Sequence, residues 1–217
     1  ETSKPLVVVT APGPGSGKMA TCLSQLYHEH LHGVNAGYAK FETFPIWNLP
    51  LKHPVNLAYE AATIDLNDVN MIDPFHLEKY NETTVNYNRD IEIFPVLNAM
   101  FNKIFGESPY ASPTDMGVNM AGYAIIDNEA AKDASCREIV RRYYHAEVDY
   151  LMGKINTKSL EKMQMLLSQA NVDAKNRKCA IFAKEIAEAR QVPACAIELN
   201  DGHLISGKTS SLLRASS

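Results

Sequence analysis

A lysine preceded by closely spaced glycines carries the clearest chemical signal in the sequence. The residues of this turn are Gly13, Gly15, Ser16, Gly17 and Lys18. Glycines let the backbone turn so that several N–H groups face inward, and the start of a helix adds a partial positive charge. A lysine ammonium in that position reaches the outer oxygens of a phosphate group. The pattern therefore predicts a site for a phosphate or another anion, and a plain turn with a surface lysine is the alternative.

The pattern differs from the phosphate loop of nucleotide hydrolases, GxxxxGK[ST], at two positions. Pro12 replaces the first glycine, and Met19 replaces the serine or threonine whose hydroxyl binds Mg²⁺. Thr21 is a poor substitute, because it lies about 200° further around a helix. The Ser16 hydroxyl is the other candidate. A nucleotide is compatible with the turn, the identity of any cofactor stays unknown, and Met19 argues against bound Mg²⁺.

Polar side chains crowd the loops between residues 38 and 120, and loops on a rigid scaffold are where binding residues concentrate. The candidate ligand contacts there are Lys40, Arg89 and Asn119. Together with Lys18, the two cations could neutralise a phosphorylated ligand, with the arginine acting as a bidentate fork. The alternative is a set of buried polar networks that satisfy irregular backbone.

The same loops hold candidate acid–base residues, which are Asp73, His76 and Asp115. A general acid or base must lie within hydrogen-bond reach of the proton that it transfers. Asp73 and Asp127 each end an apolar run, so either carboxylate could lie at the end of a strand near the glycine-rich turn. The alternatives are a turn-forming role for Asp73 and a helix-capping role for Asp127.

A second motif, HExxH, is formed by His28, Glu29 and His32. On a helix the two histidines lie one turn apart and could share a zinc ion, with the glutamate as the base of a metallopeptidase. A third ligand would have to come from elsewhere in the chain. The alternative is a group of polar residues near a helix C-terminus, where the dipole favours partly protonated imidazoles.

Two elements must position the glycine-rich turn, a buried parallel strand over residues 6–10 and a helix over residues 19–31. Further along, the patterns predict helices over residues 54–64, 91–105, 128–152, 157–170 and 173–190, strands over 69–72 and 123–126, and a β-hairpin with an Asp-Gly turn over 193–207. The predicted fold is α/β: a P-loop-like parallel sheet with flanking helices, then a helical hairpin, then a small α+β piece that ends in the β-hairpin.

Three parts follow from this order: a phosphate-loop domain over residues 1–126, a helical segment over 127–172 and a small α+β segment over 173–217. The sequence enters directly into a predicted strand and stops without completing an element, so both ends of the chain look truncated. We therefore expect the chain to be an excised segment of a longer protein.

Composition narrows the classes of function. The chain has 217 residues, a net charge of −4 and four cysteines without close spacing. The charge lacks the basic stripe of a general nucleic-acid binder, and no apolar run approaches the roughly 20 residues that span a bilayer. Four scattered cysteines predict free thiols in a reducing cytoplasm. A homo-oligomer is compatible with this composition.

Several of these stretches resemble one known family. They include TAPGPGSGKMATCLSQLYHEH, GYAKFETFPIWNLPLKHPVNLAYEAAT, DLNDVNMIDPFHLEKY, ETTVNYNRDIEIFPVLNAM and SPYASPTDMGVNMAGYAI. They are similar to an uncharacterised bacterial protein family, a domain of unknown function, and the resemblance covers the whole chain. It implies a cytosolic bacterial setting, no established reaction, and longer proteins with an α/β segment before residue 1 and more chain after residue 217.

Some members of that family have been labelled ATP-dependent peptidases. The part of the family pattern that matches a phosphate loop is Gly13, Gly15, Ser16, Gly17 and Lys18, and the pattern does not include His32. Three hypotheses stay open: an enzyme or binding protein that holds a phosphorylated ligand or nucleotide at the turn; a zinc metallopeptidase; and a non-catalytic assembly module.

Overall fold

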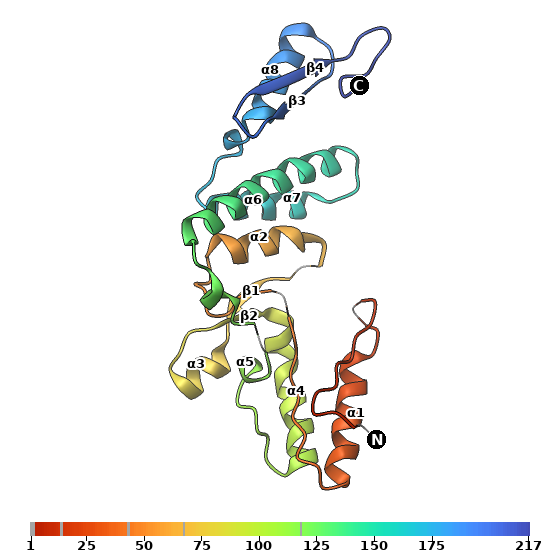
Figure 1. The fold of residues 1–217 in the computed structure, drawn as a ribbon, viewed down its shortest axis with the longest axis vertical. Helices are drawn as coiled ribbons and strands as arrows, with labels where there is room; N and C mark the ends of the chain where they lie inside the picture. Colours follow the sequence, from red (N-terminus) through yellow and green to blue (C-terminus); the bar gives the residue numbers. More distant parts are fainter. Residues whose placement is uncertain (1–2, 14, 43, 67, 118) are drawn as a thin grey trace. The chain divides into compact units, whose positions relative to one another are not determined.

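The structure, a computed structural model, describes residues 3–13, 15–42, 44–66, 68–117 and 119–217 (Figure 1). Its α-helices are α1 (Lys18–Leu31), α2 (Pro54–Ala62), α3 (Pro74–Tyr80), α4 (Asn88–Phe105), α5 (Pro113–Met116), α6 (Asn128–Leu151), α7 (Thr157–Gln169) and α8 (Lys178–Arg190). Its strands are β1 (Asn70–Ile72), β2 (Val85–Tyr87), β3 (Ala194–Glu198) and β4 (Leu204–Lys208). The protein is therefore a mixed α/β protein in which helices predominate.

The chain divides into two compact units that are interleaved in sequence. Unit 1 consists of Glu1–Leu51 and Asp68–Ile125, and unit 2 of Lys52–Asn67 and Ile126–Ser217. The boundary at residues 125 and 126 lies beside the predicted boundary at 126. The segment with α2, however, belongs with the later helices and not with the phosphate-loop domain in which the sequence pattern placed it.

The predicted P-loop-like parallel sheet is not found in the described residues. β1 pairs with β2 and β3 pairs with β4, both antiparallel, and a single parallel bridge joins Lys40 to Gly117. Residues 6–10 are extended but form no strand, and the side chains of Leu6 and Val8 are 77% and 76% exposed. A β-branched run favours extended backbone, but it becomes a buried strand only beside neighbouring strands, which this part of the chain does not provide.

Other predicted elements have mixed outcomes. The helices predicted over residues 54–64, 128–152 and 157–170 are confirmed as α2, α6 and α7, and the C-terminal β-hairpin is confirmed as β3 and β4. The strand predicted over 123–126 is wrong, because Ala121–Ala124 forms a 3₁₀ turn. Asp127 caps α6 by accepting a 2.9 Å hydrogen bond from the Ala130 N–H, as the capping alternative predicted.

The core of unit 1 forms where α1 meets α4 and α5. Leu23 and Leu26 of α1 are three residues apart and so face the same way, toward Phe94 and Phe101 of α4. Met116 of α5 completes the buried set, and the contacting side chains around it include Met19 and Tyr38. This packing fixes the first turn of α1 against α4, and it therefore fixes the position of the glycine-rich turn that precedes α1.

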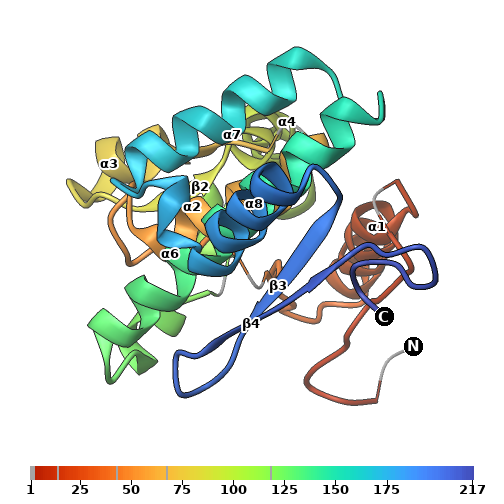
Figure 2. The same ribbon diagram turned by 90° about the horizontal axis from the view of Figure 1, so that it is seen from above.

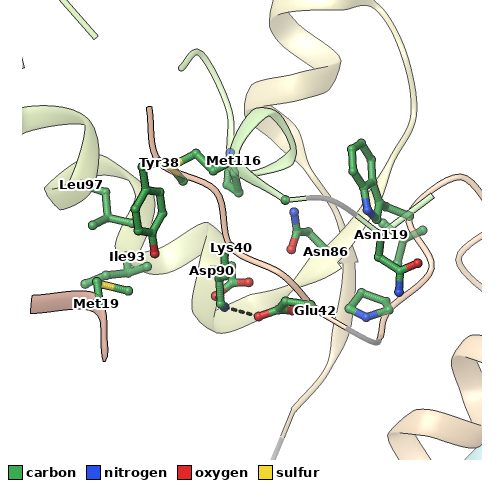
Figure 3. A pocket seen from close by; sticks show the side chains of 15 residues that line it. Met19, Tyr38, Lys40, Glu42, Asn86, Asp90, Ile93, Leu97, Met116 and Asn119 are labelled. Carbon is green, nitrogen blue, oxygen red and sulfur yellow. Dashed lines mark hydrogen bonds and ion pairs between the residues drawn. The ribbon is translucent and has the colours of Figure 1, made fainter. Parts of the chain in front are cut away.

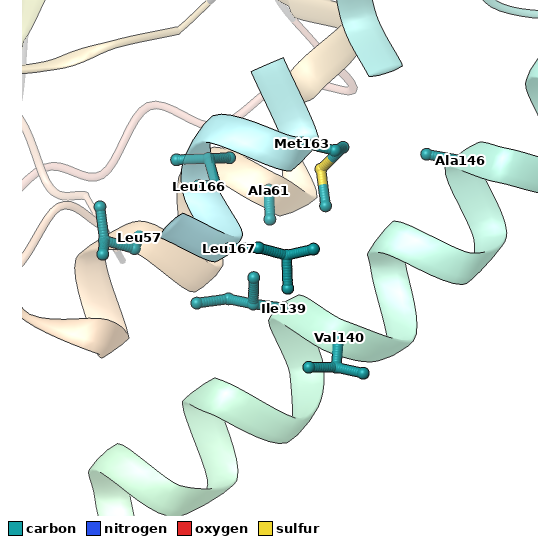
Figure 4. Close-up of a cluster of buried hydrophobic side chains, with 8 residues drawn as sticks. All are labelled: Leu57, Ala61, Ile139, Val140, Ala146, Met163, Leu166 and Leu167. Carbon is teal, nitrogen blue, oxygen red and sulfur yellow. The ribbon is translucent and has the colours of Figure 1, made fainter. Parts of the chain in front are cut away.

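The core of unit 2 is built by α2, α6 and α7, as Figure 4 shows. Its buried side chains are Leu57, Ala61, Ile139, Val140, Ala146, Met163, Leu166 and Leu167. In the same unit, the hairpin of β3 and β4 lies beside α8 (Figure 2). Helices α2, α6 and α7 each bury apolar side chains on one face, which is the usual source of helix stability in a folded domain.

Candidate functional site

The glycine-rich turn has the backbone geometry that an anion site needs. Gly15 and Gly17 have φ angles of 72° and 83°, in the left-handed region that residues with a Cβ rarely adopt. Gly17 is the N-cap of α1 and has no side chain to cap it, and its carbonyl accepts the Thr21 N–H at 3.0 Å. No described residue accepts a hydrogen bond from the Met19 or Ala20 N–H. These donors at the start of α1 stay available to a ligand.

The Lys18 side chain folds back over the turn instead of extending into water. Its Nζ donates hydrogen bonds to the Gly13 carbonyl at 2.8 Å and to Ser16 Oγ at 3.1 Å. The Ser16 hydroxyl in turn donates to the Gly13 carbonyl at 2.5 Å. The ammonium therefore lies above the positive end of the α1 dipole, where a bound anion would contact both.

A small pocket opens beside the first turn of α1 (Figure 3). Its walls include Met19, Tyr38, Trp47, Asn86, Leu97 and Asn119. Its volume of about 30 Å³ has room for one or two water molecules or for the end of a small ligand. Because Met19 directly follows Lys18 in the helix, the pocket and the glycine-rich turn are neighbouring sites on unit 1.

Three charged side chains form the floor of this pocket, and Figure 3 shows them between Tyr38 and Asn119. Lys40 Nζ donates to Asp90 Oδ1 at 2.5 Å and forms an ion pair with Glu42 Oε1. The backbone holds Lys40 in place, since its N–H donates to the Met116 carbonyl at 2.6 Å. Asp90 lies in the first turn of α4, where a negative charge is favoured. One ammonium is thus shared by two carboxylates.

The pKa values of Glu42 and Lys40 in this triad are both raised, for different reasons. Burial and the negative charge of Asp90 raise the pKa of Glu42 to about 7, although Lys40 acts in the opposite direction. Burial lowers the pKa of Lys40, but the two carboxylates outweigh it and leave that pKa raised. A carboxyl group with a pKa near neutrality in a pocket is a candidate for binding or proton transfer.

The sequence patterns singled out Lys40 but missed Glu42 and Asp90. Residues two apart on an extended segment face the same side, so the spacing of Lys40 and Glu42 is a signal that was available. No such signal exists for Asp90, because its position beside Lys40 depends on how α4 packs against the segment that carries Lys40.

Arg89 points to a different partner from the one predicted. Its Nε and Nη2 contact the two Asp68 carboxylate oxygens at 2.7 and 2.8 Å, and Asp68 is only 2% exposed. The guanidinium fork is therefore engaged by a buried carboxylate. Lys40 is engaged by its own acidic partners, so the structure does not gather Lys18, Lys40 and Arg89 around one space.

The three predicted acid–base residues lie together, in a buried network that joins α3 to α5. Asp73 caps α3 by accepting the Phe75 and His76 N–H groups at 3.1 Å, and its other oxygen accepts the Thr114 N–H and hydroxyl at 3.1 and 2.6 Å. Four donors thus satisfy one fully buried carboxylate. The arrangement matches the alternative of a polar network, and a catalytic role for Asp73 stays a prediction.

His76 and Asp115 continue the network around Ser112. His76 Nδ1 lies 2.9 Å from Ser112 Oγ and 3.6 Å from Asp115 Oδ1, and Asp115 Oδ2 accepts the Ala111 and Ser112 N–H groups. A serine, a histidine and a carboxylate within reach are also the parts of a nucleophilic site. Here Ser112 is 0% exposed and caps α5, so its hydroxyl is closed off from a substrate.

Asn119 faces the pocket, as Figure 3 shows, and is 6% exposed. Its Oδ1 accepts the Ala121 N–H at 3.0 Å, which fixes the side chain in the pocket wall. Of the predicted ligand contacts outside the glycine-rich turn, Lys40 and Asn119 therefore line one pocket, and Arg89 lies apart from it.

The histidine motif at the end of α1 gains no geometric support as a zinc site. His28 and His32 are exposed, and Glu29 accepts a 2.7 Å hydrogen bond from Gln25 Nε2. Within the ranges that the structure describes, no three or more histidine, cysteine and acidic side chains come together in a way that could hold a metal ion. Nor does any helix in those ranges have the length and apolar character to cross a membrane.

Comparison with known proteins places the chain among its relatives. The profile described as "Domain of unknown function DUF1846, N-terminal" matches residues 1–171, and "Domain of unknown function DUF1846, C-terminal" matches residues 175–217. A UPF0371 protein of Streptococcus sanguinis (strain SK36) is 59% identical over 212 residues, which are 98% of this chain and 43% of the relative.

A UPF0371 protein of Streptococcus pneumoniae (strain P1031) is 60% identical over 212 residues, with the same coverage of both chains. The chain thus spans less than half the length of these curated relatives. Two profiles that together cover nearly every residue, and relatives at this level of identity, lead to one conclusion: the chain belongs to the DUF1846 family of proteins of unknown function.

Proposed function

We propose that this protein binds a phosphorylated small molecule, with the phosphate group held at the turn of residues 13–18. The observation that carries the proposal is the position of the Lys18 ammonium, which its bonds to Gly13 and Ser16 hold above the start of α1. An arriving phosphate would replace a neutral carbonyl with a charged acceptor, and charge-assisted hydrogen bonds are about twice as strong as neutral ones.

The backbone supports the same proposal. The left-handed glycines Gly15 and Gly17 turn the chain into α1 without a capping side chain, and the first-turn N–H groups of Met19 and Ala20 have no acceptor among the described residues. Water satisfies such donors in the free protein, and an anion satisfies them better because it also interacts with the helix dipole.

The proposal is for binding, and it does not include hydrolysis of a nucleotide with bound Mg²⁺. Met19 occupies the position of the usual hydroxyl ligand, and its side chain packs against the core of unit 1 and lines the pocket. A thioether is a poor ligand for a hard cation that prefers oxygen. A nucleotide or a sugar phosphate would therefore bind through its phosphate oxygens and not through a metal ion.

A reducing, cytoplasmic setting is part of this proposal. The four cysteines, Cys22, Cys136, Cys179 and Cys195, are free thiols in the structure. Free thiols persist where glutathione and thioredoxin keep them reduced, and phosphorylated metabolites are found in the same compartment.

The test is binding measured by calorimetry and by thermal unfolding of the full chain. Inorganic phosphate, pyrophosphate, ATP and a hexose phosphate are the probes, with chloride at matched ionic strength as the reference. We expect Lys18→Ala to weaken binding about 10-fold or more, the value of one charge-assisted hydrogen bond. The exposed Lys103 of α4 is the control, and Lys103→Ala should bind as the parent does. Equal affinity in the Lys18→Ala variant, or no response to any phosphate, overturns the proposal.

A further inference from the structure

The acidic pair at the floor of the pocket has unused capacity to accept hydrogen bonds. Lys40 engages Oε1 of Glu42 and Oδ1 of Asp90. In the part of the chain that the structure describes, no donor contacts the second oxygen of either carboxylate. The two side chains are 20% and 17% exposed and both line the pocket, so each is partly accessible although most of it is buried.

The pocket also has an excess of negative charge. Two carboxylates face one ammonium, so the ionised triad carries a net charge of −1. Arg89 also acts on Glu42 and lowers its pKa, and Glu42 in turn acts on Tyr38, whose pKa is raised mainly by burial. Neither neutralises the excess, since Arg89 is paired with Asp68 and a tyrosine with a raised pKa is uncharged.

The shape and walls of the pocket fit a small cation. A volume of about 30 Å³ has room for an ammonium head group, which is close in size to a water molecule. Tyr38 and Trp47 line the space, and aromatic faces attract an ammonium group through their π electrons.

We propose that this pocket binds the primary ammonium group of a small ligand, between the free oxygens of Glu42 and Asp90. With the ligand bound, two ammonium groups alternate with two carboxylates, and the set is neutral. Each carboxylate then accepts hydrogen bonds from both cations. The ammonium site does not depend on the proposed phosphate site.

The class of the whole ligand does rest on the proposed function. Met19 lines the pocket and follows Lys18 in α1, so a ligand that engages both sites carries a phosphate at one end and an amine at the other. A phosphorylated primary amine is therefore the ligand class that the two neighbouring sites select.

Ethylammonium is the probe for the pocket, and its binding to the full chain is followed by NMR titration and calorimetry. Binding requires ionised Glu42, so affinity should rise about 10-fold from pH 6 to pH 8, the change in the ionised fraction of a group with a pKa of about 7. Proton release should accompany binding at pH 7. An affinity that does not rise with pH overturns the proposal.

Variants separate the pocket from general surface charge. Glu42→Gln should weaken ethylammonium binding at pH 8 by about 10-fold or more and should abolish its pH dependence, and Asp90→Asn should weaken binding several-fold. Glu92 is an exposed acid on α4, and Glu92→Gln should bind as the parent does. Thermal unfolding checks that each variant is folded. If Asp90→Asn does not fold, the affinity of Glu42→Gln alone decides the test. Full affinity in folded Glu42→Gln overturns the proposal.

The phosphate site and the ammonium site are told apart in the same series. Lys18→Ala should leave ethylammonium binding unchanged, and Glu42→Gln should leave inorganic phosphate binding unchanged, so that each site can fail independently of the other. O-phosphoethanolamine should bind more tightly than either ethylammonium or inorganic phosphate, and Lys18→Ala and Glu42→Gln should each weaken it. If it binds no more tightly than phosphate alone, the phosphorylated-amine class is overturned.

Discussion

The Thr114 hydroxyl donates a 2.6 Å hydrogen bond to the Asp73 carboxylate, although the two residues lie 41 positions apart in the chain. Both side chains are buried, and the Thr114 N–H donates to the same carboxylate oxygen at 3.1 Å. This contact ties the start of α3 to α5. It also explains why an aspartate suits this position, since a carboxylate has two acceptor oxygens for the four donors from the two segments, whereas an asparagine has one.

Replacing Thr114 with valine tests that contact. Thr114→Val keeps the shape of the side chain but removes one donor to a buried carboxylate, and it should lower the free energy of unfolding by about 1–3 kcal/mol in urea denaturation. Thr83, an exposed neighbour of the same network, is the matched control, and Thr83→Val should change stability by less than about 0.5 kcal/mol. Equal effects of the two substitutions would contradict a structural role for the contact.

The raised pKa of Glu42 predicts a pH dependence of stability. Because the folded protein holds this proton more tightly than the unfolded chain, the stabilisation from Glu42 is complete below pH 4.5 and is lost as the pH rises through about 7. The shift from 4.5 to about 7 corresponds to roughly 3 kcal/mol at most. The glutamine in Glu42→Gln does not titrate. The free energy of unfolding of this variant, relative to the parent, should therefore be higher at pH 8 than at pH 5.

Chemical denaturation at both pH values, with Glu92→Gln as a control for exposed charge, measures this difference. A stability difference between Glu42→Gln and the parent that is the same at pH 5 and pH 8 would show that the folded-state pKa of Glu42 is ordinary.

Because Arg89 pairs with Asp68, we expect replacement of Arg89 to lower the stability of the protein and to leave ligand binding unchanged. Arg89→Ala leaves a carboxylate that is 2% exposed without its guanidinium, and we expect a loss of about 1–3 kcal/mol, reduced from the value for a fully buried pair because Arg89 is half-exposed. The surface pair of Arg137 and Asp133 is the control, and Arg137→Ala should cost less than about 1 kcal/mol. A large loss of phosphate affinity in folded Arg89→Ala would return this arginine to the ligand site.

Gly13 and Gly17 provide a test of the turn itself. Gly17 has a φ of 83° and open space around it, so Gly17→Ala meets no side chain and costs only backbone strain, about 1–2 kcal/mol. Gly13 also has open space but no positive φ, so Gly13→Ala should be nearly neutral. Urea denaturation measures both variants, and equal costs would mean that the turn does not hold Gly17 in the left-handed region.

The core of unit 2 offers a matched pair of methionines on α7. Met163 is 0% exposed and Met165 is 51% exposed. Met163→Ala should lower the free energy of unfolding by about 2–5 kcal/mol through lost burial and a residual cavity, whereas Met165→Ala should cost less than about 1 kcal/mol. Thermal unfolding provides the comparison, and a similar loss in both variants would refute the arrangement of α7 in Figure 4.

The sequence predicted those features that depend on local patterns. The turn before α1, the cap at Asp127 and the hairpin of β3 and β4 each follow from residue types within a few positions of one another. The strand at residues 6–10 did not follow, because the same β-branched run is a strand only when other strands lie beside it. Local propensity specifies extended backbone there and nothing more.

The candidate site was predicted in part for the same reason. Lys18 and its glycines are consecutive, whereas the pocket joins Lys40, Glu42 and Asp90 through the packing of α4 against a distant segment. The role of Asp73 depends on Thr114 in the same way. Contacts of this kind leave no local pattern, so reading a single sequence cannot separate a buried polar network from a ligand site.

The interleaved order of the two units has a consequence during synthesis. Helix α2 leaves the ribosome well before α6 and α7, with which Leu57 and Ala61 share their core. Until residues 126 onward have been translated, these apolar side chains have no cover from their partners within unit 2. Nascent chains halted before α6 should therefore be cleaved by proteases near α2 and retained by chaperones, and release should coincide with the emergence of α7.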